Sequence, residues 1–345
     1  MLNKMKLQRK ILQIVLLSSL LCIPGCVLDL RPLSDTLDTE ISQLVEKEFD
    51  GMIVYVNQGN ESKLYSAGWK NRENKIPADP HALFKIASIS KLYIAAATVK
   101  LVADGQLSLD DRLSQLIPEV SGKIENADVI TLKLLLKHRS GIPEFIYHPD
   151  FGNRDPEESY LATASLIYDQ PADFEPDQKY KYSNTNYLLI GEILDRTLGY
   201  SHHLYIKNEI LLPLGLTNTY SLYSEVDPEK VMSGYYKGYE SDLKANDYTR
   251  PGGSMVATAE DVGLFLRALI DGTLLTPEEQ YLYSSVHVYE HTGWLGGYTS
   301  IARYHKDIDA VVIQFVNTSG KEIFWLKLEN AYDRIVRVLK KELLR

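Results

Sequence analysis

Hydrophobic and polar residues alternate in short runs near both ends of the chain, and this period of two predicts β-strands. Two such runs occupy residues 52–56 and 63–69, and the glycine-containing segment between them has the composition of a hairpin turn. Three more strands are expected at residues 285–292, 298–304 and 310–316. The sheet is therefore expected to be assembled from the two ends of the chain.

Between these ends, apolar residues recur at intervals of three and four, which predicts helices. The clearest case runs from Ser88 to Val102, and others are expected at residues 39–49, 131–138, 158–168, 187–197, 205–212, 259–270 and about 322–343. The economical fold is of the α/β (α+β) class. It has one antiparallel sheet of about five strands, flanked by N- and C-terminal helices, with a mostly helical subdomain inserted at about residues 106–280.

The first 25 residues are typical of a secretory signal. Four basic residues, Lys4, Lys6, Arg9 and Lys10, precede a mostly apolar stretch of 15 residues at positions 11–25. A helix that spans a bilayer needs roughly 20 such residues. A cleaved leader is therefore favoured over a permanent transmembrane anchor.

Cys26 follows the small residue Gly25, an arrangement that resembles a bacterial lipobox, and it is the predicted lipidation site. The alternatives are an ordinary cleaved signal and an uncleaved anchor. With lipidation, residues 1–25 are the signal, 26–38 a tether and 39–345 the folded domain. The expected location is extracytoplasmic, with the protein lipid-anchored to a bacterial membrane in the periplasm or at the cell surface.

Composition narrows the classes of function. Hydrophobic residues make up 45% of the 345 positions and charged residues 24%, as in an ordinary globular protein. Removal of the four basic residues of the leader changes the formal net charge from −9 to −13, and such a surface does not attract nucleic acid. Cys22 lies in the leader, so the mature protein has at most Cys26 at its start; disulfides and thiolate metal sites are not expected, and neither is a cofactor.

Three short motifs occur in order along the chain and together supply the groups of an acyl-transfer site: Ser88-Ile89-Ser90-Lys91, Tyr182-Ser183-Asn184 and His291-Thr292-Gly293. Ser88 and Lys91 are three apart on a predicted helix, so both side chains project from one face. An alcohol needs a base within hydrogen-bond reach to act as a nucleophile, and Lys91 meets that condition. Tyr182 can relay a proton, and the amide of Asn184 can hold a polar part of the substrate.

Each motif alone is weak. A Ser-x-x-Lys is expected roughly once by chance in a chain of this size, and a second one, Ser241 to Lys244, lies in a predicted loop. Tyr55-Val56-Asn57 imitates the second motif but ends a predicted strand ahead of Ser88. Asn184 could instead cap the helix that follows it. Only the ordered set is specific.

The residues around the motifs also match a known family. The chain resembles the serine β-lactamase and penicillin-binding-protein family, in particular its class C-like β-lactamase, D,D-carboxypeptidase and esterase branch. The resemblance spans about residues 48 to 340. It is carried by Phe84 to Lys91, Leu135 to Pro143, Tyr182 to Tyr187, Pro213 to Leu216 and Thr258 to Val262.

This resemblance implies a β-lactamase/transpeptidase-like fold and a role for each motif residue. Ser88, Lys91 and Tyr182 are the expected catalytic residues. Asn184, His291, Thr292 and Gly293 are expected to bind substrate, and the backbone N–H groups of Ser88 and Trp294 to form the oxyanion hole. The branch favours Tyr182 as the shared acid and base, with Lys91 holding its charge state, although the residues themselves leave open which of the two removes the Ser88 proton.

The chain departs from the family at His291, where β-lactamases of this branch usually carry lysine. An unperturbed histidine is mostly neutral at pH 7 and anchors a substrate carboxylate less well than lysine. The expected function is therefore an envelope serine hydrolase of peptides of the D-Ala-D-Ala type, amides or esters. The alternatives are a β-lactamase with weak or narrow activity and a non-hydrolytic penicillin-binding sensor or scaffold. Peptidoglycan fragments or β-lactams would be partners in either case.

Overall fold

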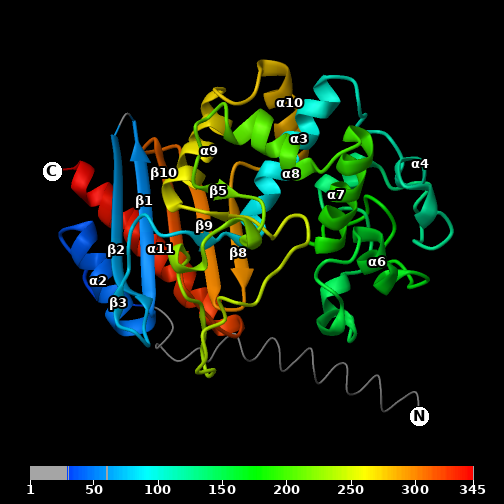
Figure 1. The fold of residues 1–345 in the computed structure, drawn as a ribbon. Helices are drawn as coiled ribbons and strands as arrows, with labels where there is room; N and C mark the ends of the chain where they lie inside the picture. Colours follow the sequence, from blue (N-terminus) through cyan, green and yellow to red (C-terminus); the bar gives the residue numbers. More distant parts are fainter. Residues whose placement is uncertain (1–28, 30, 60, 345) are drawn as a thin grey trace, which may run out of the picture.

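The computed structural model describes residue 29, residues 31–59 and residues 61–344 (Figure 1). The predicted signal, the lipidation site at Cys26 and the first part of the tether lie outside the described residues. Within the described part of the chain, no helix combines the length and apolar character needed to cross a bilayer.

The centre of the molecule is an antiparallel sheet whose strands come from both ends of the chain (Figure 1). Its spatial order is β3-β2-β1-β10-β9-β8. Five strands are long and the sixth, β3, has two residues, which confirms the predicted class and sheet. The strands are β1 (Gly51–Gln58), β2 (Glu61–Asn71), β3 (Ile76–Pro77), β8 (His291–Leu295), β9 (Tyr298–His305) and β10 (Ala310–Val316).

The two central strands explain why the ends of the chain must meet. β1 pairs antiparallel with β10, so that Met52 lies opposite Val316, and both strands are buried almost throughout. At one end of this pair the Asp50 N–H donates to Thr318 Oγ1, 2.9 Å away across 268 positions of sequence. Strands covered on both faces are apolar at successive positions rather than at every second one.

Helices cover both faces of the sheet (Figure 1). The terminal helices α2 (Leu37–Glu48) and α11 (Glu322–Leu343) pack on one face. On the other face lies α9 (Ala259–Asp271), where Gly263 lets the Tyr55 ring come close, because a Cβ there would be 2.1 Å from Tyr55 Cε1. Both terminal helices were predicted close to their observed limits.

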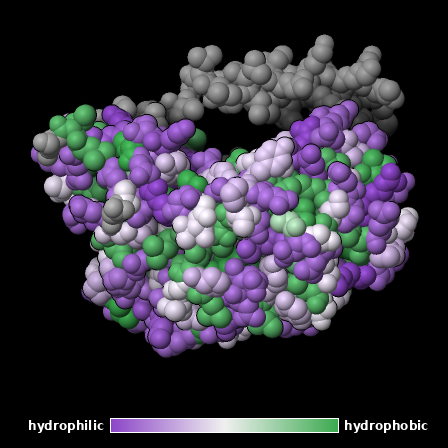
Figure 2. Space-filling view, turned by 90° about the horizontal axis from the view of Figure 1, so that it is seen from above, coloured by the Kyte–Doolittle hydropathy of each residue, from purple (hydrophilic) through white to green (hydrophobic). Residues whose placement is uncertain are grey.

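The regular structure in the long region between α3 (Ser90–Ala103) and β8 is mostly helical, as expected. Its α-helices, besides α9, are α4 (Leu113–Leu116), α5 (Leu132–Leu136), α6 (Tyr160–Ala164), α7 (Asn184–Leu198), α8 (His202–Ile206), which continues as a π-turn over Lys207–Leu211, and α10 (Pro277–Val286). Two-residue strands also occur: β5 (Thr219–Tyr220) and β4 (Phe84–Lys85) flank β7 (Val256–Ala257), and β6 (Tyr235–Tyr236) pairs with β11 (Thr318–Ser319). Seen from above, the surface mixes hydrophilic residues with small groups of hydrophobic ones (Figure 2).

The strand predicted at residues 285–292 is wrong, because its first part is the end of α10 and β8 begins only at His291. A capping box starts α10: the Glu279 N–H donates to Thr276 Oγ1, and the Thr276 N–H donates to Glu279. Tyr283 and Val286 then turn inward at a spacing of three. The capping box therefore predicts the observed helix better than the short alternation of apolar residues around Val286, which predicted a strand.

Candidate active site

Ser88 lies in a single 3-10 turn, η2 (Ala87–Ile89), between β4 and α3. The predicted helix therefore starts two residues later than Ser88. Ala87 has φ = 51°, a left-handed conformation that costs energy in a residue with a Cβ. Ser90 holds the turn, since its Oγ donates to Ala87 O at 2.6 Å and accepts from the Met255 N–H at 3.2 Å. The turn presents Ser88 at the boundary between the sheet and the helical region.

The reactive groups of the first two motifs meet at Ser88 Oγ. Lys91 Nζ lies 3.0 Å from it and Tyr182 Oη lies 2.7 Å from it. Lys91 Nζ also donates to Asn184 Oδ1 at 2.8 Å and to Gly252 O at 2.7 Å. A hydroxyl, an amine and a phenol that are far apart in sequence therefore form one hydrogen-bonded cluster.

Burial shifts the pKa values of this cluster in opposite directions. Lys91 is fully buried, and desolvation of its charged form lowers its pKa to about 7, although the Glu144 carboxylate opposes the shift. Burial raises the pKa of Tyr182 above its usual value, so its phenol stays protonated at neutral pH. Lys91 therefore exchanges its proton near neutrality, and Tyr182 is a proton donor at rest.

Glu144, which the sequence analysis missed, fixes the orientation of Asn184. Its Oε2 accepts from the Asn184 backbone N–H at 2.6 Å and from Asn184 Nδ2 at 3.0 Å, and its Oε1 accepts from the Ile146 N–H at 3.2 Å. The amide nitrogen is thereby turned to Glu144 and the amide oxygen to Lys91. Ser183, not Asn184, is the residue at the N-cap position of α7. One feature of the sequence could have identified Glu144 as a site residue: it directly follows Pro143, the last residue of a segment that resembles the family.

The third motif forms the edge strand β8, beside the turn that carries Ser88. A two-residue turn joins β8 to β9 and pairs Leu295 with Tyr298. Because hydrogen-bonded pairs alternate in an antiparallel ladder, the Trp294 N–H points away from β9 toward the free edge. Ser88 and Trp294 line the same cavity, as an oxyanion hole requires.

Close packing of β8 explains why position 293 is glycine. A Cβ at this position would lie 2.4 Å from Ile86 O and 2.2 Å from Ser300 Oγ. The close approach of β8 to the turn before Ser88 therefore excludes a side chain at position 293.

His291 and His138 both lie near Tyr182 in neutral form. His291 Nδ1 is 2.6 Å from Thr292 O, and burial together with the positive charge of Lys91 lowers the pKa of His291 to about 3. His138 is buried, its ring centroid is 4.5 Å from that of Tyr182, and its Nδ1 accepts from the Ser183 N–H at 3.2 Å. Burial lowers the pKa of His138 to about 2. His138 is a structural support for Tyr182.

A cavity of about 590 Å³ opens over Ser88. Its lining joins the three motifs to a set of apolar and aromatic side chains, and none of the lining residues is lysine or arginine. Glu144 is its one carboxylate. The cavity is lined by Ala87, Ser88, Glu144, Ile146, Tyr147, Phe151, Tyr182, Asn184, Tyr248, Gly253, His291, Thr292, Gly293, Trp294, Leu295 and Trp325.

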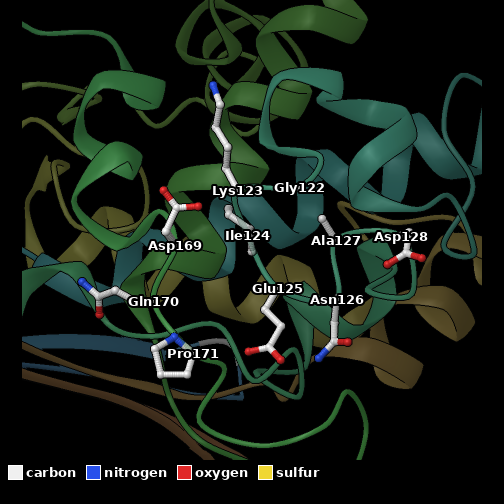
Figure 3. A pocket seen from close by; sticks show the side chains of 10 residues that line it. All are labelled: Gly122, Lys123, Ile124, Glu125, Asn126, Ala127, Asp128, Asp169, Gln170 and Pro171. Atoms are coloured by element: carbon white, nitrogen blue, oxygen red, sulfur yellow. The ribbon is translucent and has the colours of Figure 1, made fainter.

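A second hollow, of about 420 Å³, lies on the helical region between residues 122–128 and 169–171 (Figure 3). Its side chains come from two loops, and one of them, Glu125, already accepts a hydrogen bond from the Ala172 N–H at 2.6 Å. None of its ten lining residues belongs to the three motifs. This hollow on the helical region therefore holds none of the predicted catalytic or substrate-binding residues.

The fold and the serine-centred cluster define a class of acyl-transferring serine hydrolases. The family model described as Beta-lactamase matches residues 37–288, and the chain therefore belongs to the beta-lactamase family, whose members include serine hydrolases.

Two curated relatives are similar over part of their length. A penicillin-binding protein of Bacillus subtilis strain 168 is 29% identical over 222 residues, which cover 62% of this chain and 47% of that protein. Protein flp of Staphylococcus aureus strain N315 is 28% identical over 194 residues, which cover 54% of this chain and 39% of that protein. The matched part thus spans less than half the length of either relative.

A solved structure shares the fold over most of the chain. D-amino acid amidase from Ochrobactrum anthropi SV3, complexed with D-phenylalanine, superposes with a TM-score of 0.78 at 23% sequence identity. The match covers 89% of this chain and 99% of that one. The sheet with an inserted helical region is therefore a known architecture.

Proposed function

We propose that the protein is an envelope serine hydrolase that forms an acyl-enzyme at Ser88 with amides, peptides or esters. The observation that carries this proposal is the cluster in which Ser88 Oγ lies 3.0 Å from Lys91 Nζ and 2.7 Å from Tyr182 Oη, at the base of a cavity of about 590 Å³. The leader and Cys26 support the envelope location.

Lys91 is the proposed base of the acylation step. In its neutral form it keeps two N–H groups for Asn184 Oδ1 and Gly252 O, and its lone pair faces Ser88. It removes the Ser88 proton as Oγ attacks the carbonyl carbon of the substrate. The backbone N–H groups of Ser88 and Trp294 stabilise the negative charge on the carbonyl oxygen.

Tyr182 is the proposed acid. As the bond to the leaving group breaks, the phenol donates its proton to the departing amine or alcohol, which leaves tyrosinate beside protonated Lys91. In deacylation the tyrosinate takes a proton from a water molecule, whose oxygen attacks the acyl carbon, and Lys91 returns its proton to Ser88 Oγ. Both side chains end in their starting states.

The cavity favours substrates without a carboxylate near the scissile bond. Its lining offers no lysine or arginine, His291 is neutral, and Glu144 is an anion. Its apolar and aromatic walls, with Tyr147, Phe151 and Trp325 among them, suit a hydrophobic or aromatic acyl group. The solved amidase that shares the fold was complexed with D-phenylalanine, which makes aromatic D-amino acid amides the first substrates to test.

Two alternatives follow from the same site. Weak or narrow β-lactam hydrolysis uses the same nucleophile but lacks the usual lysine at position 291. A non-hydrolytic sensor would be acylated at Ser88 and would stop there. Peptidoglycan fragments are candidate ligands in both cases.

The test compares the purified protein with its Ser88→Ala variant on an activated ester, D-phenylalanine amide, a D-Ala-D-Ala peptide and a chromogenic cephalosporin. The chain provides its own control, because Ser241 begins the second Ser-x-x-Lys in a loop. Ser88→Ala should abolish turnover and Ser241→Ala should leave it unchanged. Turnover that survives Ser88→Ala contradicts the assignment, and stable labelling by penicillin without turnover favours the sensor.

A further inference from the structure

The first turn of α11 carries large apolar side chains that are exposed to solvent. Ile323 is 56% exposed and Leu326 is 46% exposed, and Trp325 lies between them. Trp294, 50% exposed, lies on the neighbouring edge strand β8. We call these four residues the apolar rim.

The apolar rim borders the active-site cavity. Trp294 and Trp325 both belong to the cavity lining that includes Ser88. Gly293 faces Ile86, so Trp294, next to it in the strand, points to the opposite face of the sheet, where α11 packs. The start of α11 lies at the lower end of the sheet, close to β8 (Figure 1). A substrate that enters beside these tryptophans passes the rim.

The N-terminal segment of the described chain is held against the same helix. The Asp29 N–H donates to Asn330 Oδ1 at 3.0 Å, and Arg334 donates to Asp29 O at 2.9 Å and to Pro32 O at 3.1 Å. From Pro32 back to Asp29, the chain therefore runs toward the start of α11. Positions 323, 326 and 330 share one side of the helix because they are three and four residues apart.

The sequence shortly before Asp29 carries the predicted leader and lipidation site. The mostly apolar stretch ends at Gly25, and Cys26 is three positions before Asp29. Three residues span about 10 Å at full extension. An anchor at this point of the chain is therefore tethered close to the segment bound by α11.

We propose that the apolar rim rests on a lipid bilayer, so that the cavity opens at the lipid–water interface. Aliphatic and tryptophan side chains partition into that interface, whereas the acidic surface of the domain gains nothing from anionic headgroups. The substrate class that follows, which rests on the proposed function, is an amphiphilic amide or ester whose apolar part stays in the membrane.

Brominated lipids test the contact without using activity. The protein has three tryptophans, so Trp69→Phe leaves Trp294 and Trp325 as reporters. The full chain in this background is reconstituted into phosphatidylethanolamine and phosphatidylglycerol vesicles, with or without dibrominated acyl chains. Strong quenching of tryptophan fluorescence by the brominated lipid is expected, and its absence overturns the proposal.

The matched variants remove equal amounts of exposed apolar surface. Ile323→Ser with Leu326→Ser removes half of the rim, and Leu204→Ser with Leu212→Ser, at 49% and 59% exposure, removes similar side chains from another surface. Loss of two half-exposed aliphatic side chains should weaken docking about 30-fold. Quenching should fall in the first variant only. Equal quenching in both overturns the proposal, as does a concentration-dependent dimer that needs Ile323 and Leu326.

Hydrolysis separates this proposal from the proposed function. On a vesicle-embedded ester the Ile323 and Leu326 double variant should lose about 30-fold in rate, matching its weaker docking, and on a soluble ester it should match the parent. If Ser88→Ala leaves turnover unchanged but quenching persists, the serine assignment fails while the membrane contact stands. Equal rates of both double variants on the vesicle-embedded ester refute the consequence for the substrate.

Discussion

Acid should destabilise the protein in part because His138 is buried in its neutral form. Replacing His138 should therefore reduce the loss of unfolding free energy at low pH. The His138 side chain is 5% exposed, and burial lowers its pKa to about 2. In the unfolded chain a histidine titrates near 6.5. Below that pH the unfolded state binds the proton and the folded state does not. This contribution to stability is therefore complete above about pH 6.5 and decreases as the pH falls toward 2.

The size of the effect follows from the two pKa values. At pH 5 the unfolded imidazole is almost fully protonated, which favours unfolding by about 2 kcal/mol relative to pH 8. His138→Asn is the suitable change, because Asn Oδ1 can accept the Ser183 N–H in place of Nδ1. Asparagine also tolerates the left-handed backbone at this position, where φ is 54°.

Urea denaturation of the parent and of His138→Asn at pH 8 and pH 5 measures this share. The parent should lose about 2 kcal/mol more than the variant between the two pH values. His81→Asn, at an exposed histidine, controls for the substitution itself. Equal losses of unfolding free energy in the parent and in His138→Asn would show that folding does not lower the pKa of His138.

Three further outcomes are expected. For amide hydrolysis, kcat/KM should rise with pH and reach a plateau, with an apparent pKa of about 7 that belongs to Lys91. A rise that occurs only far above pH 7 would instead assign Tyr182 as the base. Glu144→Gln should lower kcat/KM about 10-fold to 100-fold, because the Asn184 amide loses the carboxylate that orients it. The same change should move the midpoint of the pH–rate profile to lower pH, because the carboxylate raises the pKa of Lys91. Gly293→Ala should cost about 2 kcal/mol in urea unfolding and most of the activity, because its Cβ overlaps Ile86 O, and native stability would contradict this contact.

The parts of the site that follow local geometry could be predicted from the sequence. Ser88 and Lys91 are three residues apart where the 3-10 turn η2 runs into α3, so their contact follows from local helical spacing. The sheet could be inferred because its strands carry uninterrupted or alternating apolar residues at the two ends of the chain.

The parts that depend on distant backbone could not be predicted. Gly252 supplies a carbonyl oxygen to Lys91 from 161 positions away, and a carbonyl leaves no mark in the sequence. Glu144 orients the Asn184 amide that accepts from Lys91, and the position of its side chain depends on how the loop after Pro143 folds. The start of α10 was missed although Thr276 and Glu279 spell a capping box, because apolar residues near its end were read as alternation.

The pairing of β1 with β10 has a consequence for biosynthesis. Asp50 and Thr318 meet across 268 positions, so the central pair of strands cannot form until almost the whole polypeptide has left the ribosome. Until then the edge strand β8, which lies beside Ser88 and pairs with β9, has no completed sheet to join. A hydrolase built in this way completes its sheet, and with it the strand edge of its cavity, only late in translation.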